Sequence, residues 1–199
     1  MSKVERDLSL PQDELALGYE IQQRFMGIQD RTAEFPDPEM GQEVSRYLSE
    51  QSPLVDFFLA VPESSYDVRV NEHTPQGPSA STRTNLAHLV QSLRGRTNGL
   101  WTGEIRWEPK DQREEQLPKR VLMEMLMDVT EEFVEVAAGT KVHKMIKIPK
   151  GKEFDAVTAV QFIRDMAGHA VLHQGIAIAG VGDLIGMPRS AAFTRRWGP

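Results

Sequence analysis

The sequence predicts an all-α protein: a four-helix bundle with crossover connections, preceded by a helical N-terminal extension. Three observations lead to this fold class. Four segments carry apolar residues at the spacing of amphipathic helices, and the connections between them are long enough to run along a bundle. The pattern of a strand is weak and confined to residues 142–148. The length of 199 residues suits one domain with an extension, which we divide into residues 1–40 and 41–199.

The first two helices of the bundle differ in how clearly their ends are marked. Residues 41–61 have apolar side chains at helical spacing but include Pro53, which we expect to kink or restart the helix. The second helix follows Ser81, a favourable N-cap residue, and its apolar stripe ends near Gly95. A long polar connection with several prolines and glycines separates the two helices.

The last two helices follow the same logic. The third should start near Pro118, because proline suits a first helical turn, and end at Gly139. Residues 142–148 are then either a short strand or an extended connector. The fourth helix should start at Asp155, which is a good N-cap, and run to residues 173–175 with an alternative end near residue 186.

The N-terminal extension holds most of the acidity. It should contain a helix around Leu15–Met26, followed by a proline-rich loop at residues 34–38. Residues 1–50 carry 5 of the 23 Lys and Arg and 11 of the 29 Asp and Glu, whereas residues 51–199 carry 18 of each and are formally neutral. A neutral body offers no general attraction for a polyanion, so we expect no nucleic acid partner.

The composition excludes several classes of protein. The chain has no cysteine, which excludes disulfide frameworks, thiolate zinc sites, iron–sulfur clusters and a cysteine nucleophile. No apolar run approaches the roughly 20 residues that span a bilayer, and the first seven residues are too polar for a signal peptide. We therefore expect a cytoplasmic protein without a membrane partner.

Three histidines form the candidate site. His169 and His173 are four residues apart on one face of the last helix, where two imidazole rings can bind one metal ion. His88, beside the apolar stripe of the second helix, is the candidate third ligand. Taken alone, the pair is equally compatible with solvent-exposed or core-satisfied imidazoles, and a lone histidine such as His88 on an apolar face is more often a satisfied core residue. His73 and His143, in a loop and in the weak strand, are interpreted as solvent groups.

Three segments recur in a recognisable order. The first, residues 58–69, is a helix end followed by a proline-acidic turn. The second, residues 81–88, is a Ser-capped helix start with a histidine seven residues after the serine. The third, residues 169–175, is His-x-x-x-His followed by a polar residue and glycine, with Gly-Met-Pro after it at 186–188. Together they resemble the DinB-like, YfiT-type family over roughly residues 45–190. No single segment is specific; the conjunction carries the resemblance.

The resemblance implies a four-helix bundle, often dimeric, that holds a divalent metal ion such as zinc or nickel. His88, His169 and His173 match the family's three metal ligands. Characterised relatives are mostly transferases and isomerases that use a low-molecular-weight thiol, so we expect a small-molecule substrate and a transferase or hydrolase, although many members have no known reaction. Gln174 stands where a basic residue is common.

Three neutral imidazoles would leave the ion its full charge and an open position, and such an ion can activate water or a thiol in a chain without cysteine. Metal-bound histidines usually donate their other ring N–H to an acceptor. Asp165, one turn before His169, is the candidate acceptor, and a solvated surface carboxylate is an equally compatible interpretation. Asn85, near His88, is a further candidate.

Two alternatives stay open at this point. Residues 176–196 also fit a helix-turn-helix, with Arg189, Arg195 and Arg196 on a basic recognition helix, which would make the chain a DNA-binding regulator. The metal site could also be vestigial, leaving a bundle that acts as an interaction module through its acidic N-terminal segment.

Overall fold

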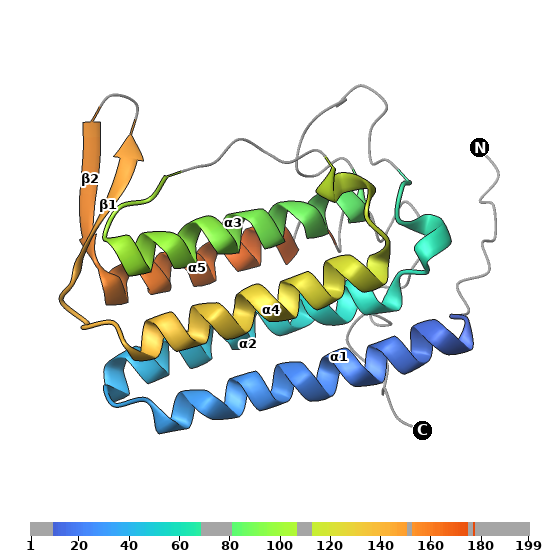
Figure 1. Ribbon diagram of the computed structural model, residues 1–199, viewed down its shortest axis with the longest axis horizontal. Coiled ribbons are helices and arrows are strands. Elements are labelled where there is room, and N and C mark those ends of the chain that lie inside the picture. The colour runs from blue at the N-terminus through green and yellow to red at the C-terminus, as the bar shows by residue number, and fades with distance from the viewer. Residues whose placement is uncertain (1–9, 69–80, 107–112, 151–152, 175–176, 178–199) are drawn as a thin grey trace.

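The computed structural model describes residues 10–68, 81–106, 113–150, 153–174 and 177, and within these it is mostly helical (Figure 1). The helices are α1 (Gln12–Asp30), α2 (Pro38–Ala60), α3 (Thr82–Thr102), α4 (Lys119–Ala138) and α5 (Ala159–Gln174). Strands β1 (Met145–Lys150) and β2 (Glu153–Thr158) form a small antiparallel pair. The predicted helical character is confirmed, with this sheet as an addition.

The five helices lie side by side with their long axes close to one common direction (Figure 1). Helix α2 packs along α5, α3 packs along α4, and α1 packs on both α4 and α2. Helices α3 and α4 start at the same end of the molecule, so the chain crosses back between them. Helix α5 starts at the other end, beside the β1–β2 pair. Helices α3 and α5, which carry the candidate histidines, therefore run in opposite directions.

The ends of α2 and α3 have clear local causes. The Asp37 side chain accepts hydrogen bonds from the first backbone N–H groups of α2, and Pro53 lies inside this helix without ending it. The prediction that the next helix ends near Gly95 is wrong, since α3 continues to Thr102. Burial of Leu100 in the core outweighs the cost of about 1 kcal/mol for a glycine inside a helix. Gly103 ends α3 with a left-handed φ of 84°.

The start of the last helix is also corrected. Asp155 was the predicted N-cap, but it lies in β2 opposite Ile148 of β1. The strand predicted over residues 142–148 is confirmed from Met145 onward. Helix α5 starts only at Ala159, where the Thr158 hydroxyl accepts the backbone N–H of Gln161. Pairing with a distant strand therefore overrides a local helix signal.

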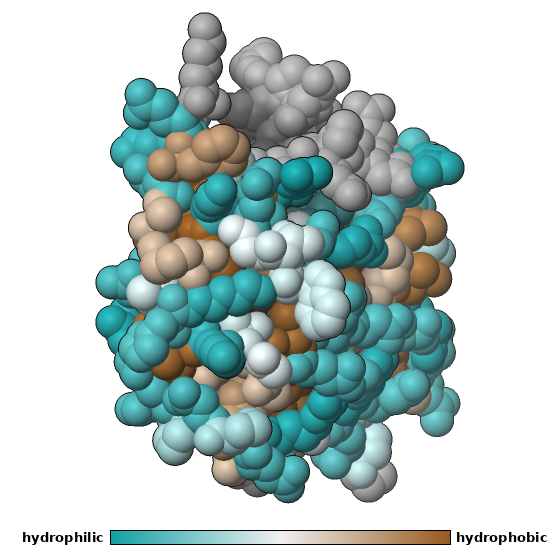
Figure 2. All heavy atoms as spheres, turned by 60° about the vertical axis from the view of Figure 1, so that its left-hand side comes forward, coloured by the Kyte–Doolittle hydropathy of each residue, from teal (hydrophilic) through white to brown (hydrophobic). Residues whose placement is uncertain are grey.

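One hydrophobic core holds the helices together. Helix α1 contributes four residues, each at most 4% exposed, to the core that the other helices share: Leu17, Ile21, Phe25 and Ile28. The division of the chain at residue 40 stays a prediction. On the face shown in Figure 2, hydrophilic residues cover most of the surface and apolar ones form separate patches. In the described part of the chain, no helix combines the length and apolar character needed to cross a membrane.

Candidate metal centre

Helix α3 places His88 two turns after its N-terminus. Ser81 starts the helix through a capping box, in which its hydroxyl accepts from the backbone N–H of Thr84 and the Thr84 hydroxyl accepts from the backbone N–H of Ser81. Ala87 and Leu89, on either side of His88, are buried, whereas His88 itself is half-buried. The ring therefore lies at the edge of the core, within reach of α5.

Helix α5 supplies the other two rings. Its apolar residues, among them Met166 and Ala170, pack into the core and fix which face of the helix is buried. His169, on the same face, is half-buried, and His173 is 3% exposed. The ring centroids of His169 and His173 are 4.5 Å apart, which is the close approach expected of residues one helical turn apart.

The three rings converge. The ring centroid of His88 lies 6.2 Å from that of His169 and 5.1 Å from that of His173. One ligand nitrogen from each ring lies within 4.8 Å of the other two. In a tetrahedral zinc site such nitrogens are about 3.3 Å apart, so a small rotation of the side chains brings them to bonding distance. This three-histidine group could hold a metal ion.

The rings are in the form that binds metal. Burial, together with the charges of Arg96, His173 and His88, lowers the pKa of His169 to about 3. Burial and Arg96 also lower the pKa of His173. Both imidazoles are therefore neutral near pH 7, with a lone pair on one nitrogen.

Asn85 of α3 holds His173 in place. Its side chain is fully buried, and its Oδ1 atom lies 3.0 Å from Nδ1 of His173. Since an amide oxygen only accepts, Nδ1 carries the proton and Nε2 is left as the ligand atom. The other candidate acceptor, Asp165, is exposed, and no hydrogen bond joins it to a histidine in the described part of the chain. Asp165 thus agrees with the alternative interpretation, in which its carboxylate is solvated.

Gln174 has a structural role at the end of α5. Its side-chain amide donates to the backbone carbonyl of Glu50 in α2. This bond ties the turn that carries His173 to a neighbouring helix.

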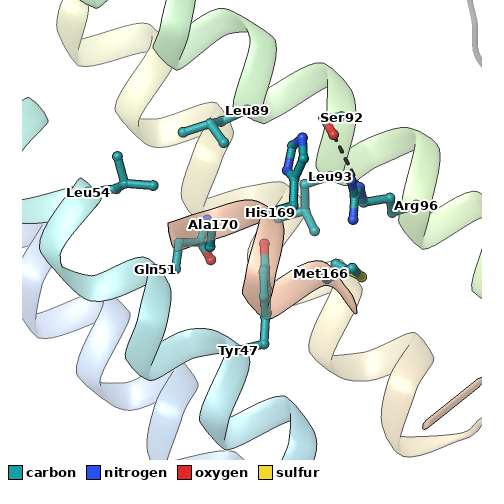
Figure 3. A pocket seen from close by; sticks show the side chains of 10 residues that line it. All are labelled: Tyr47, Gln51, Leu54, Leu89, Ser92, Leu93, Arg96, Met166, His169 and Ala170. Atoms are coloured by element: carbon teal, nitrogen blue, oxygen red, sulfur yellow. Dashed lines mark hydrogen bonds between the residues drawn. The ribbon is translucent and has the colours of Figure 1, made fainter. Parts of the chain in front are cut away.

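Three further side chains, which the sequence analysis did not identify, lie beside His169. Tyr47 and Gln51 of α2 and Arg96 of α3 line a small hollow together with His169 (Figure 3). A weak signal for them exists: Tyr47 and Gln51 are four residues apart on one face of α2, and Arg96 follows His88 by eight residues, about two turns of α3.

Comparison of the chain with protein-family models, with curated proteins and with solved structures finds no match. The site is therefore interpreted from its own geometry. His143 is exposed and away from the three-histidine group. His73 and nearly all of the helix-turn-helix candidate, including Arg189, Arg195 and Arg196, lie outside the described residues.

Proposed function

We propose that the chain is a metal-dependent enzyme built on a DinB-like four-helix bundle, with α1 added to it. The observation that supports this proposal is the convergence of His88 from α3 with His169 and His173 from α5 on one centre. Zinc and nickel suit such a set, because both accept neutral imidazole ligands. The reaction class that fits best is thiol-dependent transfer, with hydrolysis as the second candidate.

The roles of the residues follow from their chemistry. A divalent ion held by three imidazoles supplies Lewis acidity, which lets a bound water or thiol lose its proton near neutral pH. His88, His169 and His173 would hold the ion as neutral donors, so its double charge is not cancelled by the protein. Asn85 keeps His173 in the tautomer that presents Nε2. The chain itself has no cysteine, so a thiol nucleophile would come from a cosubstrate.

The proposal is tested first by metal content. Protein purified without a metal-binding tag should contain about one zinc or nickel ion per chain, measured by elemental analysis. His169→Ala should lose this ion, whereas His143→Ala, an equal truncation at an exposed histidine, should keep it. Full metal content in the His169→Ala variant would show that the ligand set is wrong.

The second test concerns activity. The metal-loaded protein is incubated with electrophilic substrates and a panel of low-molecular-weight thiols, and loss of the thiol is followed. Consumption that depends on both metal and thiol supports transfer, whereas metal-dependent turnover without a thiol supports hydrolysis. A protein that binds metal but turns over neither would be the interaction module with a vestigial site. Its oligomeric state, which we propose to be a homodimer, is measured by light scattering on the same sample.

A further inference from the structure

A hollow lies directly beside His169, between α2, α3 and α5 (Figure 3). Its volume of ≈ 10 Å³ is about the least that holds one water molecule, so one oxygen atom of a ligand would enter it while the rest of the ligand stays outside. Tyr47, Gln51 and Arg96 line it in addition to His169. The hollow thus places a phenol, an amide and a guanidinium beside the candidate metal centre.

Arg96 is half-buried and forms no ion pair with a carboxylate among the described residues, unlike the buried Arg83. Arg83 donates to Asp67 at 2.8 Å and to Glu63 at 3.1 Å. The Nε atom of Arg96 donates to the Ser92 hydroxyl at 3.3 Å, and no carboxylate forms an ion pair with Arg96 within the described residues. Burial lowers the pKa of Arg96, although the charge of Asp165 opposes this, whereas the hydrogen bond that Arg83 donates to Asp67 raises the pKa of Arg83. A desolvated guanidinium in this position is stabilised by an anion from outside the chain.

The charge of the metal centre also favours an anionic ligand. The group that could hold the ion consists of three histidines and, among the described residues, no carboxylate. A divalent ion on neutral ligands and the guanidinium of Arg96 would give a site with three positive charges. Such a site favours a ligand that brings negative charge both to the ion and to Arg96.

Tyr47 and Gln51 complete the hollow. The ring of Tyr47 packs edge-on against Phe133, with centroids 5.2 Å apart, and its hydroxyl points into the hollow (Figure 3). Burial raises the pKa of Tyr47, so the hydroxyl stays protonated and can donate. Gln51 is 2% exposed, and its Oε1 atom has no hydrogen-bond partner among the described residues. Tyr47 and Arg96 thus offer donors, and Gln51 offers one buried acceptor.

We propose that this hollow is the carboxylate subsite of the metal centre, with Arg96 as the residue that selects a carboxylate-bearing substrate. Arg96 and the Tyr47 hydroxyl donate to the carboxylate beside His169, while the rest of the substrate faces the ion. This inference rests on the proposed metal-dependent function and adds the chemical class of the substrate to it.

The test measures anion binding and needs no turnover. The full chain is loaded with cobalt(II), and formate is titrated while the visible spectrum of the cobalt is recorded; formamide serves as the uncharged probe of the same shape. Arg96→Gln should weaken formate affinity by about tenfold or more, because a charge-assisted hydrogen bond is lost. The matched control is Arg94→Gln, which removes an arginine that binds Glu114 at 3.0 Å elsewhere on α3 and should leave formate affinity unchanged.

Two results would overturn the subsite: formate affinity of Arg96→Gln within about twofold of wild type, or formamide binding to wild type as tightly as formate. If Arg96→Gln does not fold, Tyr47→Phe replaces it, since it removes one hydroxyl and keeps the ring; unchanged formate affinity would then refute the subsite. Cobalt content is measured first. A wild-type chain that takes up no cobalt refutes the metal centre itself, whereas a loaded chain without the Arg96 effect refutes only the subsite.

Discussion

Nδ1 of His173 donates a hydrogen bond of 3.0 Å to Oδ1 of Asn85, and this bond joins α5 to α3 across the candidate metal centre. Both side chains are buried, at 3% and 0% exposure, so solvent does not compete for either atom. The bond therefore fixes the tautomer of the ring and its orientation together. It also sets the distance between the helix that carries His88 and the helix that carries the other two ligands.

Removal of this acceptor should weaken metal binding. For Asn85→Ala we expect about 10- to 100-fold lower zinc affinity, since loss of a partner that orients a metal ligand typically has this effect. The dissociation constant is measured by competition with a chelator. Asn98→Ala, at an exposed position of the same helix, is the control and should bind zinc like wild type. Unchanged affinity in Asn85→Ala would show that His173 is oriented by something else.

The three candidate ligands could be identified from the sequence because their signal is local. His169 and His173 share a face of any helix that includes both, whatever it packs against. The buried neighbours of His88 indicated that its ring lies near the core. Asn85 and Asp165 show the limit of such reasoning. Asp165 has the better local spacing to His169, yet the acceptor came from another helix, and spacing within one helix carries no information about which helix faces it.

The same limit explains Tyr47 and Arg96. Tyr47 is on a predicted helix, and Arg96 lies just past the predicted end of another. Their meeting beside His169 depends on how α2, α3 and α5 pack, which is a property of the whole chain. The error at Asp155 has the same origin. A favourable N-cap residue is a local preference, and pairing with β1 supplies hydrogen bonds that no local pattern near Asp155 contains.

Metal binding should stabilise the fold, because the three ligands meet only in the folded chain. Free zinc at 100 times its dissociation constant should add about 2.7 kcal/mol to the free energy of unfolding, roughly 5–10 °C in Tm for a chain of this length. His88→Ala should lose most of this increase, while His143→Ala should show it in full. The check is a thermal melt with and without zinc; an equal increase for His88→Ala would exclude it as a ligand.

Stability should also depend on pH through Asp56 of α2, which pairs with Gln22 of α1. Burial raises its pKa, although Gln22 donates to the carboxylate at 2.7 Å and partly opposes this. Because the pKa is higher in the folded state, the folded chain binds the proton more tightly, and stability falls as pH rises through the folded pKa. Asp56→Asn should therefore raise Tm at pH 7, and this gain should shrink towards pH 4. Denaturant melts across this range measure it; no gain at pH 7 would contradict it.

A buried ion pair links the N-terminal helix to the rest of the chain: the Glu14 carboxylate accepts from Lys119 Nζ at 2.6 Å. Lys119 is 1% exposed and also donates to the backbone carbonyls of Leu59 and Val61, so the loss of Glu14 removes a charged partner from a buried cation. Glu14→Gln should lower the free energy of unfolding by about 3 kcal/mol in urea melts. Glu20→Gln, which breaks the exposed pair with Arg120 at 3.4 Å, should cost under about 1 kcal/mol. Equal effects of the two variants would show that the Glu14–Lys119 pair contributes no more to stability than an exposed pair.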